Sequence, residues 1–214
     1  MTTIPFDLDS VLLVIDMQYD FMPGGALAVT EGDALVPLIN RLGQQFNGVV
    51  VTQDWHPAGH ISFASSHSGR VPFGVTTLPY GPQTLWPDHC IQGSHGAQLH
   101  SELNLPHAQL ILRKGCNPHI DSYSAFLEAD RKTPTGLASY LKERGVQNVF
   151  VVGLALDFCV AWSALDARAA GFTTLVIEDA CRAIDMNGTL DKAWRDMQAA
   201  GVTRIRSSEL LQLA

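Results

Sequence analysis

The chain has 214 residues, of which 46% are hydrophobic and 16% are charged, and its net charge is −7. This composition is typical of a globular protein with a sizeable core and excludes a disordered chain. The negative charge argues against nucleic acid or an anionic membrane as the main partner, and no signal peptide or membrane-spanning run is visible. We therefore expect one cytoplasmic domain over residues 1–214, with its four cysteines as reduced thiols.

Short apolar runs alternate along the chain with segments of helical periodicity. Uninterrupted apolar runs are typical of strands buried on both faces, and apolar residues at helical spacing predict helices. The alternation implies an α/β fold with parallel strands, right-handed crossovers and helices on both faces of the sheet. The predicted strands are 11–15, 49–52, 110–112, 148–152, 173–177 and 203–205, and the predicted helices are 33–46, 135–144, 160–168, 190–200 and a terminal turn.

The region from about 54 to 107 interrupts this alternation. Residues 55–107 carry seven of the eight histidines and few periodic apolar segments. A loop of this length inside a compact domain is usually functional. We expect this loop region to belong to the functional site.

Four chemically useful residues lie at or just beyond the ends of successive predicted strands. Asp16, Asp54 and Lys114 follow the first three strands, and Cys159 lies a few residues past the fourth. Ligands of open parallel sheets bind beyond the carboxyl ends of the strands. A single polar residue in such a position is usually a turn or cap, but four reactive types at four successive ends favour a common site.

Asp16, Lys114 and Cys159 together supply the groups that nucleophilic catalysis needs. Cys159 closes the block from Gly153 to Cys159 at a predicted strand-to-helix turn, where backbone N–H groups and the helix terminus favour a thiolate. Asp16 is the candidate general acid and base, Lys114 the electrostatic partner and Cys159 the nucleophile. The alternative is a buried Asp16–Lys114 ion pair beside an inert core cysteine.

A second set of residues has the chemistry of a metal site. Asp54 and His56 form an Asp-x-His pair, and His89 would complete three ligands with positions left open for water or substrate. Imidazole and carboxylate suit zinc, iron(II) or manganese(II). His60 is a candidate fourth ligand or outer partner. Because histidine-rich loops often bind nothing, this pattern alone leaves both interpretations open.

Five motifs together resemble the nicotinamidases, within the isochorismatase-like cysteine hydrolases. The resemblance runs in order from about residue 10 to residue 185. The metal segments are its specific part, because related hydrolases lack them. The motifs are Val14–Phe21 with Asp16, Thr52–His56, Trp86–Cys90, Arg113–Gly115 with Lys114, and Gly153–Val160 with Cys159.

The resemblance implies a three-layer α/β/α fold with a six-stranded, mainly parallel sheet. It also implies a reaction, in which nicotinamide and water give nicotinate and ammonia through a cysteine thioester, in the recycling of NAD. Asp54, His56 and His89 would hold one divalent metal ion, with zinc as the first expectation and iron or manganese as alternatives, and His60 stays open as an additional ligand.

The same resemblance implies how the substrate is held. Phe21 and Trp86 match ring-sandwiching aromatic residues, and Tyr123 matches a pocket residue, although ordinary core packing is the alternative for each. Backbone N–H groups of Ala155 and Cys159 would hold the oxyanion, next to a cis peptide bond between Leu154 and Ala155. Pyrazinamide is a second expected substrate, because its ring nitrogen and amide are arranged alike.

Two other functions remain open at this point. A related cysteine amidase would act on another small carbamoyl or ureido amide, and it would not need the metal. A catalytically silent metal-binding scaffold would use the same fold without turnover, although silent relatives tend to lack the cysteine that this chain has. We expect a small-molecule substrate and no nucleic acid or membrane partner, and the sequence leaves homo-oligomer formation open.

Overall fold

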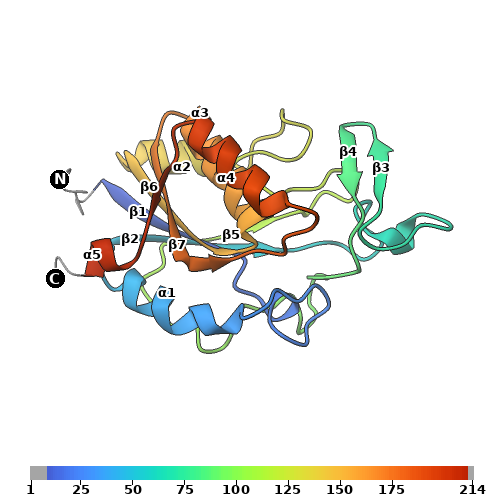
Figure 1. The fold of residues 1–214 in the computed structure, drawn as a ribbon, viewed down its shortest axis with the longest axis horizontal. Helices are drawn as coiled ribbons and strands as arrows, with labels where there is room; N and C mark the ends of the chain where they lie inside the picture. The colour runs from blue at the N-terminus through green and yellow to red at the C-terminus, as the bar shows by residue number, and fades with distance from the viewer. Residues whose placement is uncertain (1–8, 212–214) are drawn as a thin grey trace.

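The computed structural model describes residues 9–211, so the two ends of the predicted 1–214 domain lie outside the described residues. Its main feature is a six-stranded parallel sheet with the strand order β5-β2-β1-β6-β7-β8 (Figure 1). The predicted α/β class is confirmed. The strands are β1 (Ser10–Ile15), β2 (Gly48–Asp54), β5 (Leu110–Lys114), β6 (Asn148–Leu154), β7 (Thr173–Arg182) and β8 (Thr203–Ile205).

Helices cover both faces of this sheet, as the alternating pattern predicts. Figure 1 shows one group of helices on each face of the sheet, and the two core clusters separate the same groups. The first group is α2 (Leu137–Glu143), α3 (Ala161–Ala169) and α4 (Thr189–Ala199), and the second is α1 (Val36–Gly43) and α5 (Ser208–Leu211). Within the described part of the chain, no helix is long and apolar enough to cross a membrane.

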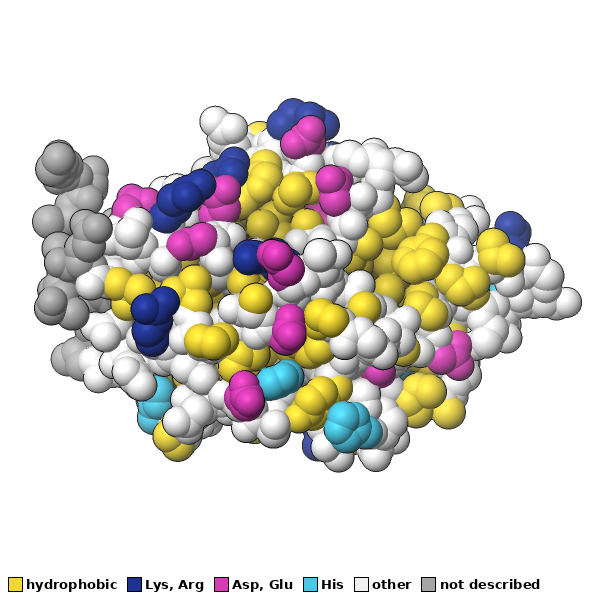
Figure 2. All heavy atoms as spheres, turned by 60° about the horizontal axis from the view of Figure 1, so that its bottom comes forward, with side chains coloured by type: hydrophobic (Ala, Val, Ile, Leu, Met, Phe, Trp, Pro, Cys, Tyr) yellow, Lys and Arg dark blue, Asp and Glu magenta, His cyan; other side chains and the backbone are white. Residues whose placement is uncertain are grey.

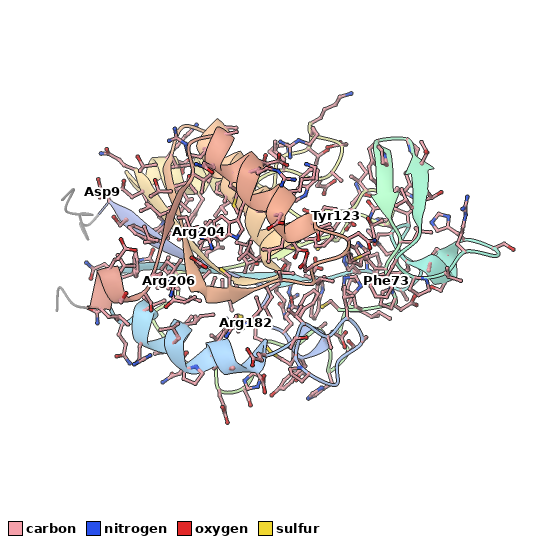
Figure 3. The ribbon with its side chains drawn as sticks, in the orientation of Figure 1. Asp9, Phe73, Tyr123, Arg182, Arg204 and Arg206 are labelled. Carbon is pink, nitrogen blue, oxygen red and sulfur yellow. The ribbon has the colours of Figure 1, made fainter. Side chains whose placement is uncertain are left out.

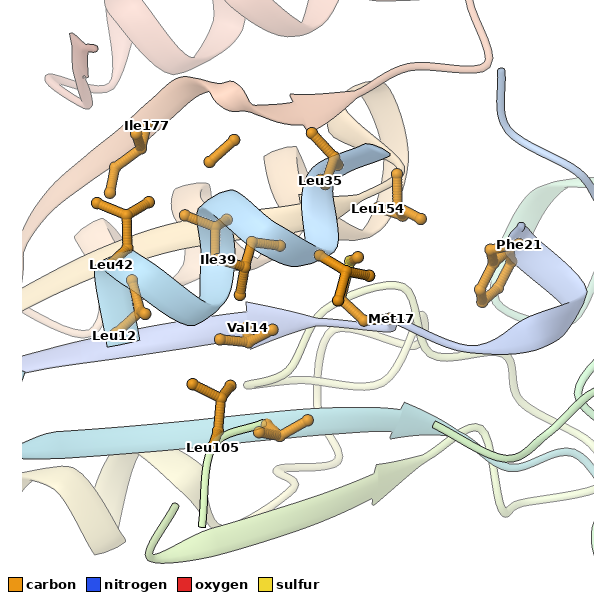
Figure 4. Packing of buried hydrophobic residues seen from close by; sticks show 14 of the residues in the cluster. Leu12, Val14, Met17, Phe21, Leu35, Ile39, Leu42, Leu105, Leu154 and Ile177 are labelled. Atoms are coloured by element: carbon orange, nitrogen blue, oxygen red, sulfur yellow. The ribbon is translucent and has the colours of Figure 1, made fainter. Parts of the chain in front are cut away.

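The central strand β1 is buried on both faces and divides the core into two clusters. Leu12 and Val14 belong to the cluster under α1, whereas Leu13 and Ile15 belong to the cluster under α2, α3 and α4. This division follows from the period of two in a strand, which sends successive side chains to opposite faces. Figure 4 shows Ile39 and Leu42 of α1 lying over Leu12 and Val14 of β1.

The loop region contains regular structure that the sequence pattern does not predict. Strands β3 (Val75–Leu78) and β4 (Gly81–Thr84) form an antiparallel hairpin, which projects to one side of the main sheet in Figure 1. The hairpin buries little, and Val75 is exposed, so no clear apolar periodicity marks it. In Figure 2, hydrophobic side chains gather on this half of the molecule, and charged side chains are more numerous on the other.

The helix after β6 also begins differently from the prediction. Residues Leu156–Val160 form a π-helical turn, η4, and the α-helix α3 starts only after it, at Ala161. Cys159 therefore lies inside a widened turn rather than just before an α-helix. Such turns are rare and are frequently found at functional sites.

Candidate active site

The four strand-end residues meet at one edge of the sheet. Asp54 and Lys114 are the last residues of β2 and β5, Asp16 directly follows β1, and Cys159 lies on η4 after β6. Strands β5, β2, β1 and β6 are consecutive neighbours in the sheet, so their carboxyl ends lie side by side. The four residues therefore lie together in the structure, as their positions in the sequence predict.

Lys114 is at the centre of the buried polar contacts. Its Nζ lies 2.8 Å from Oδ2 of Asp16 and 2.9 Å from Oδ1 of Asp54, and it donates a hydrogen bond to the carbonyl of Ser122 at 3.1 Å. It also approaches Sγ of Cys159 at 3.6 Å. One ammonium group thus touches both carboxylates and the thiol.

Asp16 is held by its backbone and by the neighbouring strand. Its φ is 48°, which turns the chain sharply after β1. Thr52 donates a hydrogen bond to Oδ1 at 2.6 Å and accepts one from the backbone N–H of Asp16 at 3.1 Å. The other oxygen, Oδ2, is buried and has the ion-pair contact with Lys114 but no aligned hydrogen bond. It therefore keeps an acceptor site for a proton from Cys159.

The resting protonation state differs from the one that the helix terminus predicts for the cysteine. Burial raises the pKa of Cys159 well above its usual value, and the charges of Asp16 and Asp54 add to this, while only Lys114 opposes it. Burial also raises the pKa of Asp16, against the lowering effect of Lys114. The pKa of Lys114 is well above normal because its two carboxylate neighbours outweigh burial. A neutral thiol therefore rests beside a lysine ammonium, and it needs a base.

The turn that carries Cys159 has the predicted backbone feature. The peptide bond between Leu154 and Ala155 is cis. Gly153 has a φ of +112°, and a Cβ atom there would lie 2.2 Å from the carbonyl oxygen of Ile15. Only glycine allows strands β6 and β1 to approach this closely, so the start of the nucleophile motif is set by backbone packing.

Asp54, His56 and His89 bring three metal-binding atoms together. Nε2 of His56 and Nε2 of His89 lie 3.2 and 3.5 Å from Oδ2 of Asp54. The Nδ1 atoms of the two rings lie 3.0 Å from the carbonyl oxygen of Gly115 and 2.8 Å from that of Pro87. Donation from Nδ1 to a carbonyl leaves Nε2 with a free lone pair, which is the arrangement of metal-binding histidines.

Two further features fit a cation at these three residues. With no cation bound, burial would by itself raise the pKa of Asp54, but a protonated His56 and the ammonium of Lys114 outweigh it and hold the pKa well below normal, so this carboxylate is ionised and attracts positive charge. Gly115 has a φ of +67°, and a Cβ atom there would lie 2.4 Å from the His56 ring. Because Gly115 has no side chain, the His56 ring can lie in its observed position. The ionised carboxylate and the two imidazoles therefore fit a divalent cation.

His60 lies next to this group but has other partners. Its ring centroid is 4.3 Å from that of His56, while its Nδ1 and Nε2 atoms lie 2.8 Å from Oγ of Ser62 and 2.8 Å from the carbonyl of Asn117. His56, His60 and Asp121 form a second group with atoms close enough to share an ion. Because a carbonyl can only accept, Nε2 of His60 carries its proton in this arrangement.

One pocket joins the two sets of residues. Its lining includes Cys159 as well as Asp54, His56 and His89. The predicted residues Phe21, Trp86, Tyr123 and Ala155 also line it, together with four residues that the sequence analysis did not identify, namely Leu27, Asp121, Phe158 and Ile184. Figure 3 shows Tyr123 on the side of the molecule where the hairpin and Phe73 lie.

Three buried polar residues beside the site escaped prediction. Gln18 donates to the carbonyl of Asp54 at 2.8 Å and accepts from its N–H at 2.7 Å, and Thr52 holds Asp16 as described above. Asp157 accepts hydrogen bonds from the segment after β7. Gln18 and Thr52 lie inside the quoted motifs, but only the strand pairing shows which partners they have.

Comparison with known proteins adds independent evidence. The isochorismatase domain family matches residues 10–209. A nicotinamidase of Acinetobacter baylyi is 60% identical over 200 residues, which cover 94% of this chain and 94% of that protein.

Solved structures agree with this similarity. A nicotinamidase and pyrazinamidase of Acinetobacter baumannii has a TM-score of 0.95 at 59% identity, over 95% of this chain and 99% of that one. A pyrazinamidase of Pyrococcus horikoshii in complex with zinc has a TM-score of 0.76 at 33% identity, over 92% and 99% of the two chains.

Proposed function

The chain belongs to the isochorismatase family and, within it, to the nicotinamidases, and we propose that it hydrolyses nicotinamide to nicotinate and ammonia through a thioester on Cys159. The observation that carries this proposal is one pocket that is lined both by Cys159, which has Lys114 and Asp16 buried behind it, and by the three residues with metal-binding atoms. A small aromatic amide with a ring nitrogen fits this pocket, since its amide group would lie at Cys159 and its ring nitrogen at the metal-binding residues.

The nucleophile is activated by its neighbours in this proposal. Oδ2 of Asp16 takes the proton of Cys159, and the ammonium of Lys114 stabilises the thiolate at 3.6 Å. The sulfur attacks the amide carbon, and Asp16 then gives the proton to the departing ammonia. A water molecule, deprotonated by Asp16, hydrolyses the thioester and releases nicotinate and the free thiol.

Backbone and aromatic groups position the substrate. The N–H groups of Ala155 and Cys159 would hold the developing oxyanion, each at a value of roughly 3 kcal/mol in comparable sites. Phe21 and Trp86 line the pocket and would enclose the pyridine ring, and Tyr123 would complete the wall. Tyr123 is itself held by hydrogen bonds from Trp86 at 2.9 Å and Gln83 at 2.8 Å.

Asp54, His56 and His89 would hold the divalent cation, with His60 as an outer partner. When bound, the cation would accept the ring nitrogen and thereby orient and polarise the substrate. We propose zinc, because the donor set suits it and the Pyrococcus horikoshii structure was solved with it. We also propose that the enzyme works in NAD salvage in the cytoplasm, since its product is nicotinate.

The first test is ammonia release from nicotinamide by the purified protein, before and after treatment with a chelator. We expect rapid release that falls on metal removal and returns with zinc. Release that ignores the chelator would contradict the metal part of the proposal. A reduced, fully metallated protein without any release would contradict the substrate assignment.

The second test separates the thiol from the metal site. Cys159→Ala removes the nucleophile, so we expect a loss on the order of 10⁴-fold or more in turnover while the metal content of the variant stays unchanged. Near-normal turnover would contradict the thioester route. Ammonia release from pyrazinamide by the wild-type protein is expected as well, and its complete absence would restrict the proposal to nicotinamide.

A further inference from the structure

Asp157 is a buried carboxylate on the nucleophile turn that takes no part in the chemistry described above. It lies two residues before Cys159 and is only 6% exposed. Its oxygens accept hydrogen bonds from the backbone N–H of Ile184 at 3.0 Å and of Asp185 at 2.9 Å. The carboxylate therefore binds residues 183–188, here called the pocket segment, which joins β7 to α4.

Thr189 completes these contacts. Its hydroxyl donates to Oδ2 of Asp157 at 2.5 Å and accepts a hydrogen bond from the N–H of Met186 at 2.8 Å. Two side chains thus bind three successive N–H groups of the pocket segment, at Ile184, Asp185 and Met186. Hydrogen bonds to an ionised acceptor in a buried position are stronger than neutral ones.

The pocket segment needs such support, because its backbone is unfavourable by itself. Asp185 and Asn187 have φ values of 53° and 54°. Left-handed conformations persist at residues other than glycine only where surrounding contacts stabilise them. The contacts with Asp157 and Thr189 supply that stabilisation.

The pocket segment also forms part of the substrate pocket. Ile184 lines the pocket, and so does Phe158, which lies between Asp157 and Cys159 on the nucleophile turn. One carboxylate therefore joins two walls, one carried by the turn and one carried by the segment. The segment contributes a single apolar side chain to the pocket and no reacting group.

We propose that Asp157, together with Thr189, is a positioning residue that fixes Ile184 against the nucleophile turn and so shapes the ring-binding pocket. This inference rests on the proposed function, since the ring of nicotinamide is the group that the pocket would hold. Asp16 and Lys114 lie on other elements, and Cys159 shares the nucleophile turn with Asp157, but the contacts of Asp157 run from that turn to the pocket segment and to Thr189. Loss of the contact therefore weakens substrate binding more than it slows the chemical steps.

Thr189 offers the sharper test, because valine keeps its shape and serine keeps its hydroxyl. We expect Thr189→Val to raise KM for nicotinamide about tenfold, with a much smaller change in kcat, because the Asp157 contact and the Met186 contact are both lost. Thr189→Ser should restore a KM near the wild-type value. Thr203→Val, on the exposed edge strand β8, is the matched control and should change neither constant.

Hydrogen exchange at the pocket segment gives a readout that needs no substrate. The N–H groups of Ile184, Asp185 and Met186 should exchange faster in Thr189→Val and in Asp157→Asn, whereas those of the central strand β1 should not. Faster exchange with the KM change supports the inference. Unchanged exchange, or faster exchange with an unchanged KM, overturns it.

These outcomes are separate from those that test the proposed function. If the wild-type protein releases no ammonia from nicotinamide, the proposed function fails, and the positioning role of Asp157 for this substrate fails with it. If the wild type is active and Thr189→Val has a wild-type KM, the proposed function stands and only this inference fails.

Discussion

Two groups of charged residues in this protein use the same chemistry in opposite surroundings. The buried cluster of Asp16, Lys114 and Asp54 has side chains that are 0, 0 and 6% exposed. The surface pair of Glu178 and Arg204 joins β7 to β8, and its side chains are 25 and 51% exposed. Both contain close carboxylate–cation contacts, but water competes for only one of them.

The difference shows how burial determines the pKa of a charged group and its contribution to stability. In the buried cluster, desolvation is the largest influence on each ionisable group, and it raises the pKa of Asp16 despite the adjacent ammonium. At the surface, the hydrogen bond from Arg204 comes first and lowers the pKa of Glu178. Removing a partner from a buried charge therefore costs several kcal/mol of the free energy of unfolding, on the order of 3–5 kcal/mol, whereas removing one from an exposed charge costs little.

The largest effect is expected for Lys114→Met, which removes the cation and leaves two buried carboxylates side by side. We expect a loss of about 3–5 kcal/mol in the free energy of unfolding of the metal-free protein, together with loss of activity. Urea denaturation in the presence of a chelator measures it, with Lys132→Met, at an exposed position, as control. A loss below about 1 kcal/mol would show that the cluster is not desolvated as the structure indicates.

An intermediate effect is expected for the pair of Arg131 and Asp166. Two hydrogen bonds of 2.9 and 2.5 Å join them, and the Asp166 side chain is 2% exposed while that of Arg131 is 46% exposed. Arg131→Met would leave one buried carboxylate without its cation, at a cost of about 1–3 kcal/mol. Adding Asp166→Asn should recover part of this loss in a double-mutant cycle, and full additivity would argue against a direct interaction.

A smaller effect, on activity, is expected for Thr52→Val. The variant keeps the shape of the side chain but removes the donor to Asp16, so kcat/KM should fall roughly tenfold. Because that hydrogen bond lowers the pKa of Asp16, its loss should move the acidic limb of the pH–rate profile to higher pH. Thr52→Ser should restore the profile, and an unshifted limb in Thr52→Val would remove Asp16 as the titrating base.

The smallest effect is expected at the surface, for Glu178→Gln. We expect a loss of about 0.2–1 kcal/mol at pH 7 that shrinks in high salt. The folded pKa of Glu178 lies below the ordinary value of 4.5, so its contribution is present above that pH and is lost as the pH falls through the lowered pKa. Urea denaturation at pH 7 and pH 3 tests this, and a difference from wild type that persists at pH 3 would contradict it.

The sequence predicts those parts of the structure that depend on local pattern. Apolar runs such as 11–15 and 148–152 identify strands because both faces of the sheet are covered, and the reactive residues at their ends meet because the strands are parallel. The hairpin β3–β4 could not be found in this way, since it is half exposed and has no core of its own.

The remaining differences come from tertiary environment. The resting state of Cys159 depends on burial and on Asp16 and Asp54, which are distant in sequence, so a local helix-terminus argument predicts the wrong direction for its pKa. Thr52 and Asp157 are ordinary polar residues until their partners are known. The roles of the catalytic and metal-binding residues stay predictions, although the geometry brings them together.

The contacts of Lys114 have one more consequence, which concerns the order of events during synthesis. Lys114 is 60 residues from Asp54 and 45 residues from Cys159 along the chain, and each of the three lies at or beyond the end of a different strand. A growing chain that ends before β6 contains Asp16, Asp54 and Lys114, whose strands are neighbours in the sheet, but it does not contain Cys159. The charged groups are therefore synthesised before the nucleophile, and the reactive centre arises only when β6 and its turn have joined the sheet.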